Sequence, residues 1–137
     1  MMIRPIMKDP MFLALPSDPA TAADRQTALD LLDTLRAHLE GCVGMAANMI
    51  GVRKRIIAVC AGLGQLVMMN PKIVSKSGAY ETEEGCLSLA GVRKTTRYQR
   101  IEVSYQDIDM KPQRRRFDGY TAQITQHEVD HCDGILI

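Results

Sequence analysis

The chain has 137 residues, which is enough for one compact domain and too few for two ordinary ones. Its 17 Lys and Arg residues balance 16 Asp and Glu residues, which argues against a nucleic-acid binder held by phosphate contacts. No stretch approaches the roughly 20 apolar residues that span a bilayer, and no signal peptide can be recognised. We therefore expect a single cytoplasmic domain over residues 1–137, with no membrane and no nucleic-acid partner.

The first predicted helix covers Ala22–Glu40, where leucines recur at helical intervals. Thr21 and Asp24 at its start resemble a capping box, and Gly41 ends it. The segment Cys42–Gly51 that follows is apolar and punctuated by glycine. It suits close backbone packing around a site better than a helix.

Short strands are expected in the middle of the chain. The pattern predicts strands at Arg55–Cys60, Gln65–Met69 and Ile101–Gln106. Asn70-Pro71 is expected to turn the chain, and the segments on either side of Ser77-Gly78 are expected to pair with each other.

The end of the chain carries a basic run and a second helix. Arg114-Arg115-Arg116 is interpreted as a solvated turn or an edge strand. Tyr120–Cys132 is predicted as a helix that Gly134 closes. The order helix, several strands, helix predicts an α+β fold with mainly antiparallel β-sheets packed around the C-terminal helix.

His127-Glu128-Val129-Asp130-His131 is the motif with the clearest chemistry. Positions four apart lie on one face of a helix, so both imidazoles can hold one metal ion. Glu128, next to the first of them, is placed to act as general acid and base. The alternative is a surface helix that holds two His and a Glu by chance.

A catalytic metal site of this kind takes a third protein ligand and leaves one position open. In the metalloprotease pattern HExxHxxGxxH that ligand is a downstream His, but Ile137 occupies the position here and cannot coordinate. The third ligand is therefore expected upstream, or at Cys132 or Asp133. Cys132 should point away from the metal-binding face of the helix, and Asp133 lies at the helix end.

Three motifs in one order carry a resemblance to a known family. Gln126–Gly134 matches QHExDHxxG, and Glu84–Ser88 matches EGCxS in full. Val43–Ala47 matches most of a GxGxAAxQ loop, with Cys42 in place of the leading Gly and Met49 in place of the closing Gln. With these motifs the chain resembles the peptide deformylases over nearly its whole length.

The resemblance implies the metal ligands and the reaction. It assigns one divalent metal ion to Cys86, His127 and His131, with Fe²⁺ expected in the cell and Zn²⁺, Ni²⁺ or Co²⁺ as replacements. Such enzymes remove the formyl group from the N-terminal formyl-methionine of newly made proteins, so nascent formyl-methionyl peptides are the expected partners. The roles it implies are proton transfer by Glu128 and oxyanion binding by the backbone N–H of Leu87.

By the same resemblance, the substrate methionine enters an apolar pocket and the peptide backbone adds like an extra strand. The residues expected to bind the substrate are Val43, Gly44, Gly85, Tyr120 and Ile124. Arg97 is expected either to meet the peptide further along or to be a surface strand residue.

Met49 is the departure from the family pattern that bears on catalysis. Its thioether has no N–H and cannot donate to an oxyanion, unless the neighbouring amide of Asn48 does so instead. The first hypothesis is a working deformylase at full or reduced rate. The alternative is a deformylase-like protein with weak or lost catalysis that binds metal and peptide. A zinc protease is the third hypothesis, and Ile137 counts against it.

The sequence ends soon after the last motif. Many bacterial members of the family continue into a further helix, which in some contacts the ribosome, whereas only Ile135–Ile137 follow Gly134 here. Ribosome docking is therefore not expected. The apolar end is expected either to pair at a dimer interface or to pack into the core.

Overall fold

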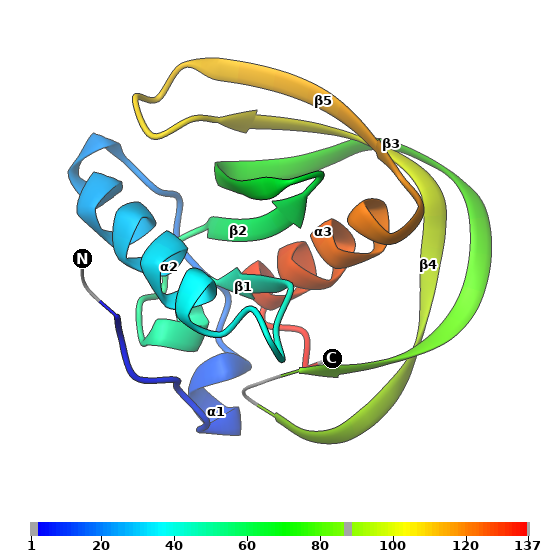
Figure 1. Cartoon of the computed structure of the whole chain (residues 1–137), viewed down its shortest axis with the longest axis horizontal. Coiled ribbons are helices and arrows are strands. Elements are labelled where there is room, and N and C mark those ends of the chain that lie inside the picture. Colours follow the sequence, from blue (N-terminus) through cyan, green and yellow to red (C-terminus); the bar gives the residue numbers. More distant parts are fainter. Residues whose placement is uncertain (1–2, 87–88, 137) are drawn as a thin grey trace.

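The computed structural model describes residues 3–86 and 89–136. Five strands form one antiparallel sheet in the order β1-β2-β3-β4-β5, and β3, β4 and β5 curve around α3 (Figure 1). The elements are α1 (Pro10–Leu13), η1 (Ala22–Asp24), α2 (Arg25–Ala37), β1 (Gly44–Ala46), η2 (Ala47–Ile50), β2 (Ile56–Ala61), β3 (Gly64–Cys86), β4 (Leu89–Gln106), β5 (Pro112–Asp118) and α3 (Gly119–Cys132). The predicted α+β class with an antiparallel sheet is therefore confirmed.

Strand β2 lies between two hydrophobic clusters because its side chains alternate. Ile56 and Ala58 belong to a first cluster, which also contains buried leucines of α2. Ile57 and Val59 belong to a second cluster, which contains buried side chains of α3. Successive residues of a strand point to opposite faces, so one short strand supports both helices.

The predicted first helix is present but shorter than expected. Asp24 accepts from the backbone N–H of Thr21 at 2.8 Å, and Thr21 accepts from Ala23 at 3.3 Å, which is the predicted capping box. The helix ends at Ala37 instead of Glu40. There the ring of His38 turns back to a carbonyl of the last turn, and Leu39 is left 42% exposed.

Strand β3 is a single long strand, whereas several short strands were predicted for this part of the chain. Asn70-Pro71 does not turn the chain but marks a register shift between Met69 and Lys72. Asn70 has a φ of 52°, and its amide donates to Ala20 at 2.9 Å and to Gln106 at 2.7 Å. A bulge accommodates a proline that has no N–H for the ladder. The expected pairing around Ser77-Gly78 is also wrong, because both flanking segments pair with β4.

The basic run Arg114–Arg116 lies on the exposed edge strand β5, which is one of the two predicted alternatives. Gly119, with a φ of 55°, connects β5 to α3, and α3 covers the predicted second helix. None of the described helices is long and apolar enough to cross a membrane.

The described end of the chain is divided between core and surface. Leu136 packs against the first hydrophobic cluster, and Ile135 is 44% exposed.

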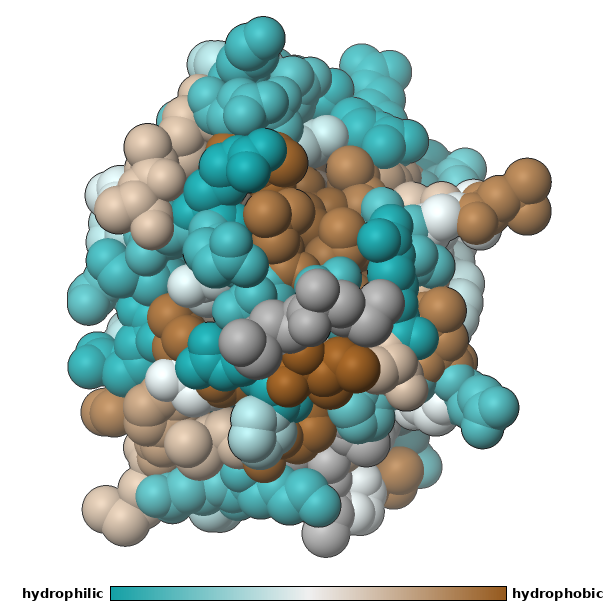
Figure 2. Space-filling model, turned by 60° about the vertical axis from the view of Figure 1, so that its left-hand side comes forward, coloured by the Kyte–Doolittle hydropathy of each residue, from teal (hydrophilic) through white to brown (hydrophobic). Residues whose placement is uncertain are grey.

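On the side of α2, hydrophobic residues gather in the middle of the surface with hydrophilic residues around them (Figure 2). The expected alternative of a dimer interface stays a prediction.

Candidate active site

The two histidines of the HExxH motif meet a cysteine from another element. On α3 the Nε2 atoms of His127 and His131 are 3.1 Å apart, and both side chains are buried. Cys86 stands at the end of β3, after a register shift in its pairing with β4. The ligand atoms of the three residues all lie within 4.8 Å of one another. Among the described residues, this is the only such group of His, Cys, Asp and Glu.

The other two candidates for third ligand lie elsewhere. Cys132 is fully buried, and burial raises the pKa of its thiol to about 12. Asp133 forms an ion pair with Arg55 at 2.7 Å. The structure therefore brings Cys86, and neither of these, to the two imidazoles.

The two histidine rings differ in protonation when no metal ion is bound. Burial lowers the pKa of His127, but hydrogen bonds with Cys86 and Glu84 outweigh it and raise the value to about 10. Burial and the neighbouring His127 lower the pKa of His131 to about 3. Without a metal ion, the two rings thus carry one positive charge, on His127, at the place where three donor atoms converge. A thiolate and two imidazoles are a donor set suited to Zn²⁺ and Fe²⁺.

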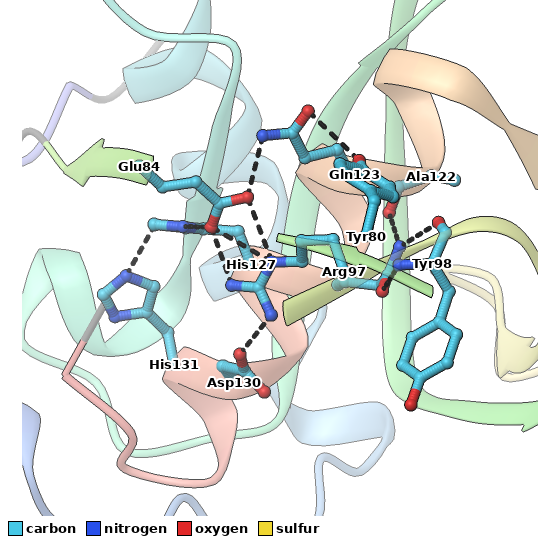
Figure 3. Close-up of polar contacts among 10 residues, drawn as sticks. Tyr80, Glu84, Arg97, Tyr98, Ala122, Gln123, His127, Asp130 and His131 are labelled. Carbon is cyan, nitrogen blue, oxygen red and sulfur yellow. Dashed lines mark hydrogen bonds and ion pairs between the residues drawn. The ribbon is translucent and has the colours of Figure 1, made fainter. Parts of the chain in front are cut away.

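Glu84 holds His127 from the side opposite the other ring (Figure 3). Its Oε1 lies 2.8 Å from Nδ1 of His127, and Gln123 donates to its Oε2 at 2.9 Å. Burial raises the pKa of Glu84, but the bonds from His127, Arg97 and Gln123 outweigh this and lower it to about 2. Glu84 is therefore an acceptor, so Nδ1 of His127 carries a hydrogen and Nε2 is the nitrogen that faces the metal position.

Arg97 is a buried part of this network and not the peptide contact or surface residue that was expected. Its side chain is 4% exposed and its Nη2 lies 2.7 Å from Glu84. Its Nη1 lies 2.6 Å from Asp130 (Figure 3). Nothing in the local sequence identifies Arg97 as the partner of Glu84. Gln123 was also missed, although its place four residues before His127 puts both on one helix face.

Glu128 is a buried carboxyl beside the ligands. It is 3% exposed, and burial raises its pKa from 4.5 to about 7. Its Oε1 has no hydrogen-bond partner among the described residues. A carboxyl that titrates near neutral pH can both take up and release a proton under ordinary conditions, as a general base and acid must.

Gly44 allows β1 to approach Glu128 closely. A Cβ atom at this position would lie 2.6 Å from Cγ2 of Ile124 and 3.0 Å from Oε2 of Glu128. The contact with Ile124 is shorter than real Cβ atoms show, so any side chain at this position would force Ile124 to shift, and glycine avoids the clash.

A cleft of about 480 Å³ opens beside the converging ligands. It is bordered by the turn after α2, by β1, by the end of β3 and by the first turns of α3. Its lining residues include Leu39, Cys42, Val43, Gly44, Met49, Gly85, Cys86, Tyr120, Gln123, Ile124, His127 and Glu128. All five residues that were expected to bind substrate are among them.

Three residues, at positions 48, 49 and 87, bear on how the site would bind an oxyanion. Met49 is almost fully buried, and its Sδ accepts from the backbone N–H of Ala46 at 3.4 Å. The amide of Asn48 donates to the backbone oxygen of His131 at 2.9 Å and Asn48 does not line the cleft, so the structure does not favour the alternative that Asn48 replaces the family Gln. Leu87 lies outside the described residues, and its role stays a prediction.

Comparison with known proteins decides the family. The family model of polypeptide deformylase matches residues 3–137. The chain belongs to the polypeptide deformylase family. It is 54% identical over 136 residues to a peptide deformylase of Clostridium beijerinckii, covering 99% of this chain and 100% of that one. A Pelotomaculum thermopropionicum peptide deformylase is 46% identical over 115 residues, 81% of this chain and 74% of that one.

Solved peptide deformylases have the same fold. The Met-Ala-Ser-bound class I type b enzyme of Acinetobacter baumannii superposes with a TM-score of 0.89 at 30% identity, covering 99% of this chain and 97% of that one. A Thermotoga maritima peptide deformylase gives 0.85 at 30% identity. The predicted family and fold are thus confirmed. Peptide deformylases use a catalytic divalent metal ion, and the Cys86, His127 and His131 group fits one.

Proposed function

We propose that this chain is a metal-dependent peptide deformylase, which removes the formyl group from the N-terminal formyl-methionine of newly made proteins. The convergence of Cys86, His127 and His131 within 4.8 Å supports this most directly. The 54% identity to the Clostridium beijerinckii peptide deformylase over the whole chain supports it further. The overall reaction adds one water, and its products are formate and a free amino terminus.

The three ligands would hold one divalent metal ion, which we propose to be Fe²⁺ in the cell, with Zn²⁺, Ni²⁺ or Co²⁺ as replacements. When bound, such an ion polarises a carbonyl oxygen and acidifies water. The protein keeps the ring of His127 oriented for it, since Oε1 of Glu84 lies 2.8 Å from Nδ1 of His127 and fixes the tautomer. Cys86 would bind such an ion as the thiolate.

Glu128 moves the proton. As a carboxylate it takes a proton from the attacking water, and as the acid it gives that proton to the amine that leaves the formyl carbon. Its pKa of about 7 supports both roles, because neither direction of transfer is then strongly uphill. The side chain is only 3% exposed at the cleft wall, which limits the access of bulk water to the proton.

The cleft would bind the start of the peptide. We propose that Tyr120, Ile124 and Val43 contact the methionine side chain and that Gly44 and Gly85 bond the peptide backbone. Leu87 would supply a backbone N–H to the oxyanion. The Met-Ala-Ser peptide bound in the Acinetobacter baumannii relative supports a peptide as the substrate.

The proposal is tested by formate release from formyl-Met-Ala-Ser. Protein loaded anaerobically with Fe²⁺ should release formate and expose the amino terminus, and acetyl-Met-Ala-Ser should remain intact. Glu128→Ala should keep its metal and lose at least 10²-fold in kcat, in line with the usual contribution of about 10²–10⁴ from general acid–base catalysis. Fully metallated wild-type protein that releases no formate would overturn the proposal.

A further inference from the structure

The 3₁₀ turn η2 carries Asn48, whose side chain contacts His131, the second histidine ligand. Asn48 is fully buried, and its Nδ2 donates to the backbone oxygen of His131 at 2.9 Å. The two residues are 83 positions apart in the sequence. This bond therefore connects the loop after β1 to the last turn of α3, where His131 lies.

Two buried polar atoms at this contact have no hydrogen-bond partner among the described residues. They are Oδ1 of Asn48 and Nδ1 of His131. The first is an acceptor and the second can carry a hydrogen, so their requirements are complementary. Because Oδ1 and Nδ2 are attached to one carbon, the bond from Nδ2 holds Oδ1 close to His131 as well. Buried polar groups in folded proteins are rarely left without partners.

The two metal-binding rings otherwise have unequal support. Nδ1 of His127 has Glu84 at 2.8 Å, which fixes that ring. Nε2 of His131 faces Nε2 of His127, so Nδ1 is the nitrogen of His131 that points away from the metal position. Histidines that bind a metal through one nitrogen donate the other N–H to an acceptor, which sets the ring orientation.

We infer that Asn48 is the positioning residue of His131, as Glu84 is of His127. Its amide N–H anchors the backbone of His131, and its Oδ1 accepts from Nδ1–H of the same residue through one buried water. The inference rests on the metal site of the proposed function. By this inference, the loop that matches the first family motif contributes to metal binding through Asn48. The next residue, Met49, is the one that replaces the oxyanion-donating Gln of the family.

Measuring the metal affinity of variants distinguishes a positioning role of Asn48 from a merely structural one. Zn²⁺ affinity is measured by competition with a chromophoric chelator in wild type, Asn48→Ala, Asn48→Asp and Asn70→Ala. Asn70 is the matched control, since its amide also donates to a backbone oxygen at 2.9 Å, but that oxygen belongs to Ala20. Urea unfolding of the metal-free proteins measures how much each change destabilises the fold.

We expect Asn48→Ala to weaken Zn²⁺ binding by about 10–100-fold, the usual effect of losing such a partner. Asn48→Asp retains an acceptor oxygen and should stay within about threefold of wild type. Asn70→Ala should lose stability and keep wild-type affinity. Unchanged affinity in Asn48→Ala, or an equal loss in Asn70→Ala, would overturn the inference.

A second measurement does not depend on the variants folding. In zinc-loaded wild-type protein, the Nδ1–H proton of His131 should give an NMR signal that is protected from exchange with solvent. An unprotected proton would contradict the inference. Wild-type protein that binds no metal at all would instead refute the proposed function, so the two failures are distinguishable.

Discussion

Nδ1 of His127 lies 2.8 Å from Oε1 of Glu84, and this carboxylate is held in turn by Arg97. The ligand is therefore oriented by a charge that is itself buried and paired. Glu84→Gln should weaken metal binding by about 10–100-fold, because the amide is a poorer acceptor for the ring N–H. Breaking the buried pair with Arg97 should also cost about 3–5 kcal/mol of stability.

Metal content after dialysis and urea unfolding check this prediction. Glu83→Gln is the control, because Glu83 is the preceding residue on β3 and is exposed. Glu84→Gln protein with wild-type metal content would show that Glu84 does not orient the ligand.

The buried carboxyl of Glu128 should make the metal-free protein sensitive to pH. Its folded pKa of about 7 lies above its ordinary value of 4.5, so its protonated form favours the fold. That contribution is complete below pH 4.5 and is lost as the pH rises through 7. Glu128→Gln stays neutral and should become more stable than wild type by about 3 kcal/mol at pH 8, with little difference at pH 4.

Urea unfolding of metal-free protein at several pH values measures this difference. Glu40→Gln removes an exposed carboxyl at the rim of the cleft and should show no such trend. A difference between wild type and Glu128→Gln that does not change with pH would contradict the raised pKa.

Met49 borders the cleft without a hydrogen to donate, since its sulfur accepts from Ala46. Met49→Gln introduces an amide N–H and should raise kcat for formyl-Met-Ala-Ser at least about tenfold, given the 10²–10³ that one oxyanion donor supplies in other enzymes. Met11→Gln, at a side chain 82% exposed, makes the same chemical change away from the cleft. An unchanged rate in fully metallated Met49→Gln would show that the missing amide does not limit turnover.

Gly44→Ala should disrupt the site by crowding it. The new methyl would lie 2.6 Å from Ile124 and 3.0 Å from Glu128, so one of them must move. We expect a loss of about 1–3 kcal/mol in unfolding free energy, together with reduced activity. Gly41→Ala is the matched control, since nothing lies within 4 Å of a Cβ there. Adding Ile124→Ala to Gly44→Ala should recover part of the lost stability, and no recovery would contradict the crowding.

The sequence predicted those features that depend on local pattern. The helix of the HExxH motif and the capping box of Thr21 and Asp24 follow from residues a few positions apart, and both are present. The approach of Cys86 to the two histidines could be predicted only through the family resemblance, because no spacing rule connects positions 86 and 127.

Features that depend on distant partners were not predicted. Asn70-Pro71 looks like a turn, yet Ala20 and Gln106 bind the Asn70 amide, and β3 continues through a register shift at this point. Arg97 has the pattern of a surface strand residue, but Glu84 and Asp130 bring its guanidinium inside. The direction of the Asn48 amide depends on the end of α3, which lies 83 residues further along.

Because the side chains of β2 alternate between two clusters, a shift of its register by one residue would move every side chain to the wrong cluster. A slip by one residue would send Ile57 and Val59 to the α2 side and Ile56 and Ala58 to the α3 side, so both clusters would be repacked at once. The chain should therefore tolerate inserted residues at the β2–β3 turn, where Leu63 is fully exposed, and not within β2 itself. A peptide tag placed at Leu63 would leave both helices and the metal ligands where they are, which makes this turn the natural point for attaching the protein to a surface or a probe.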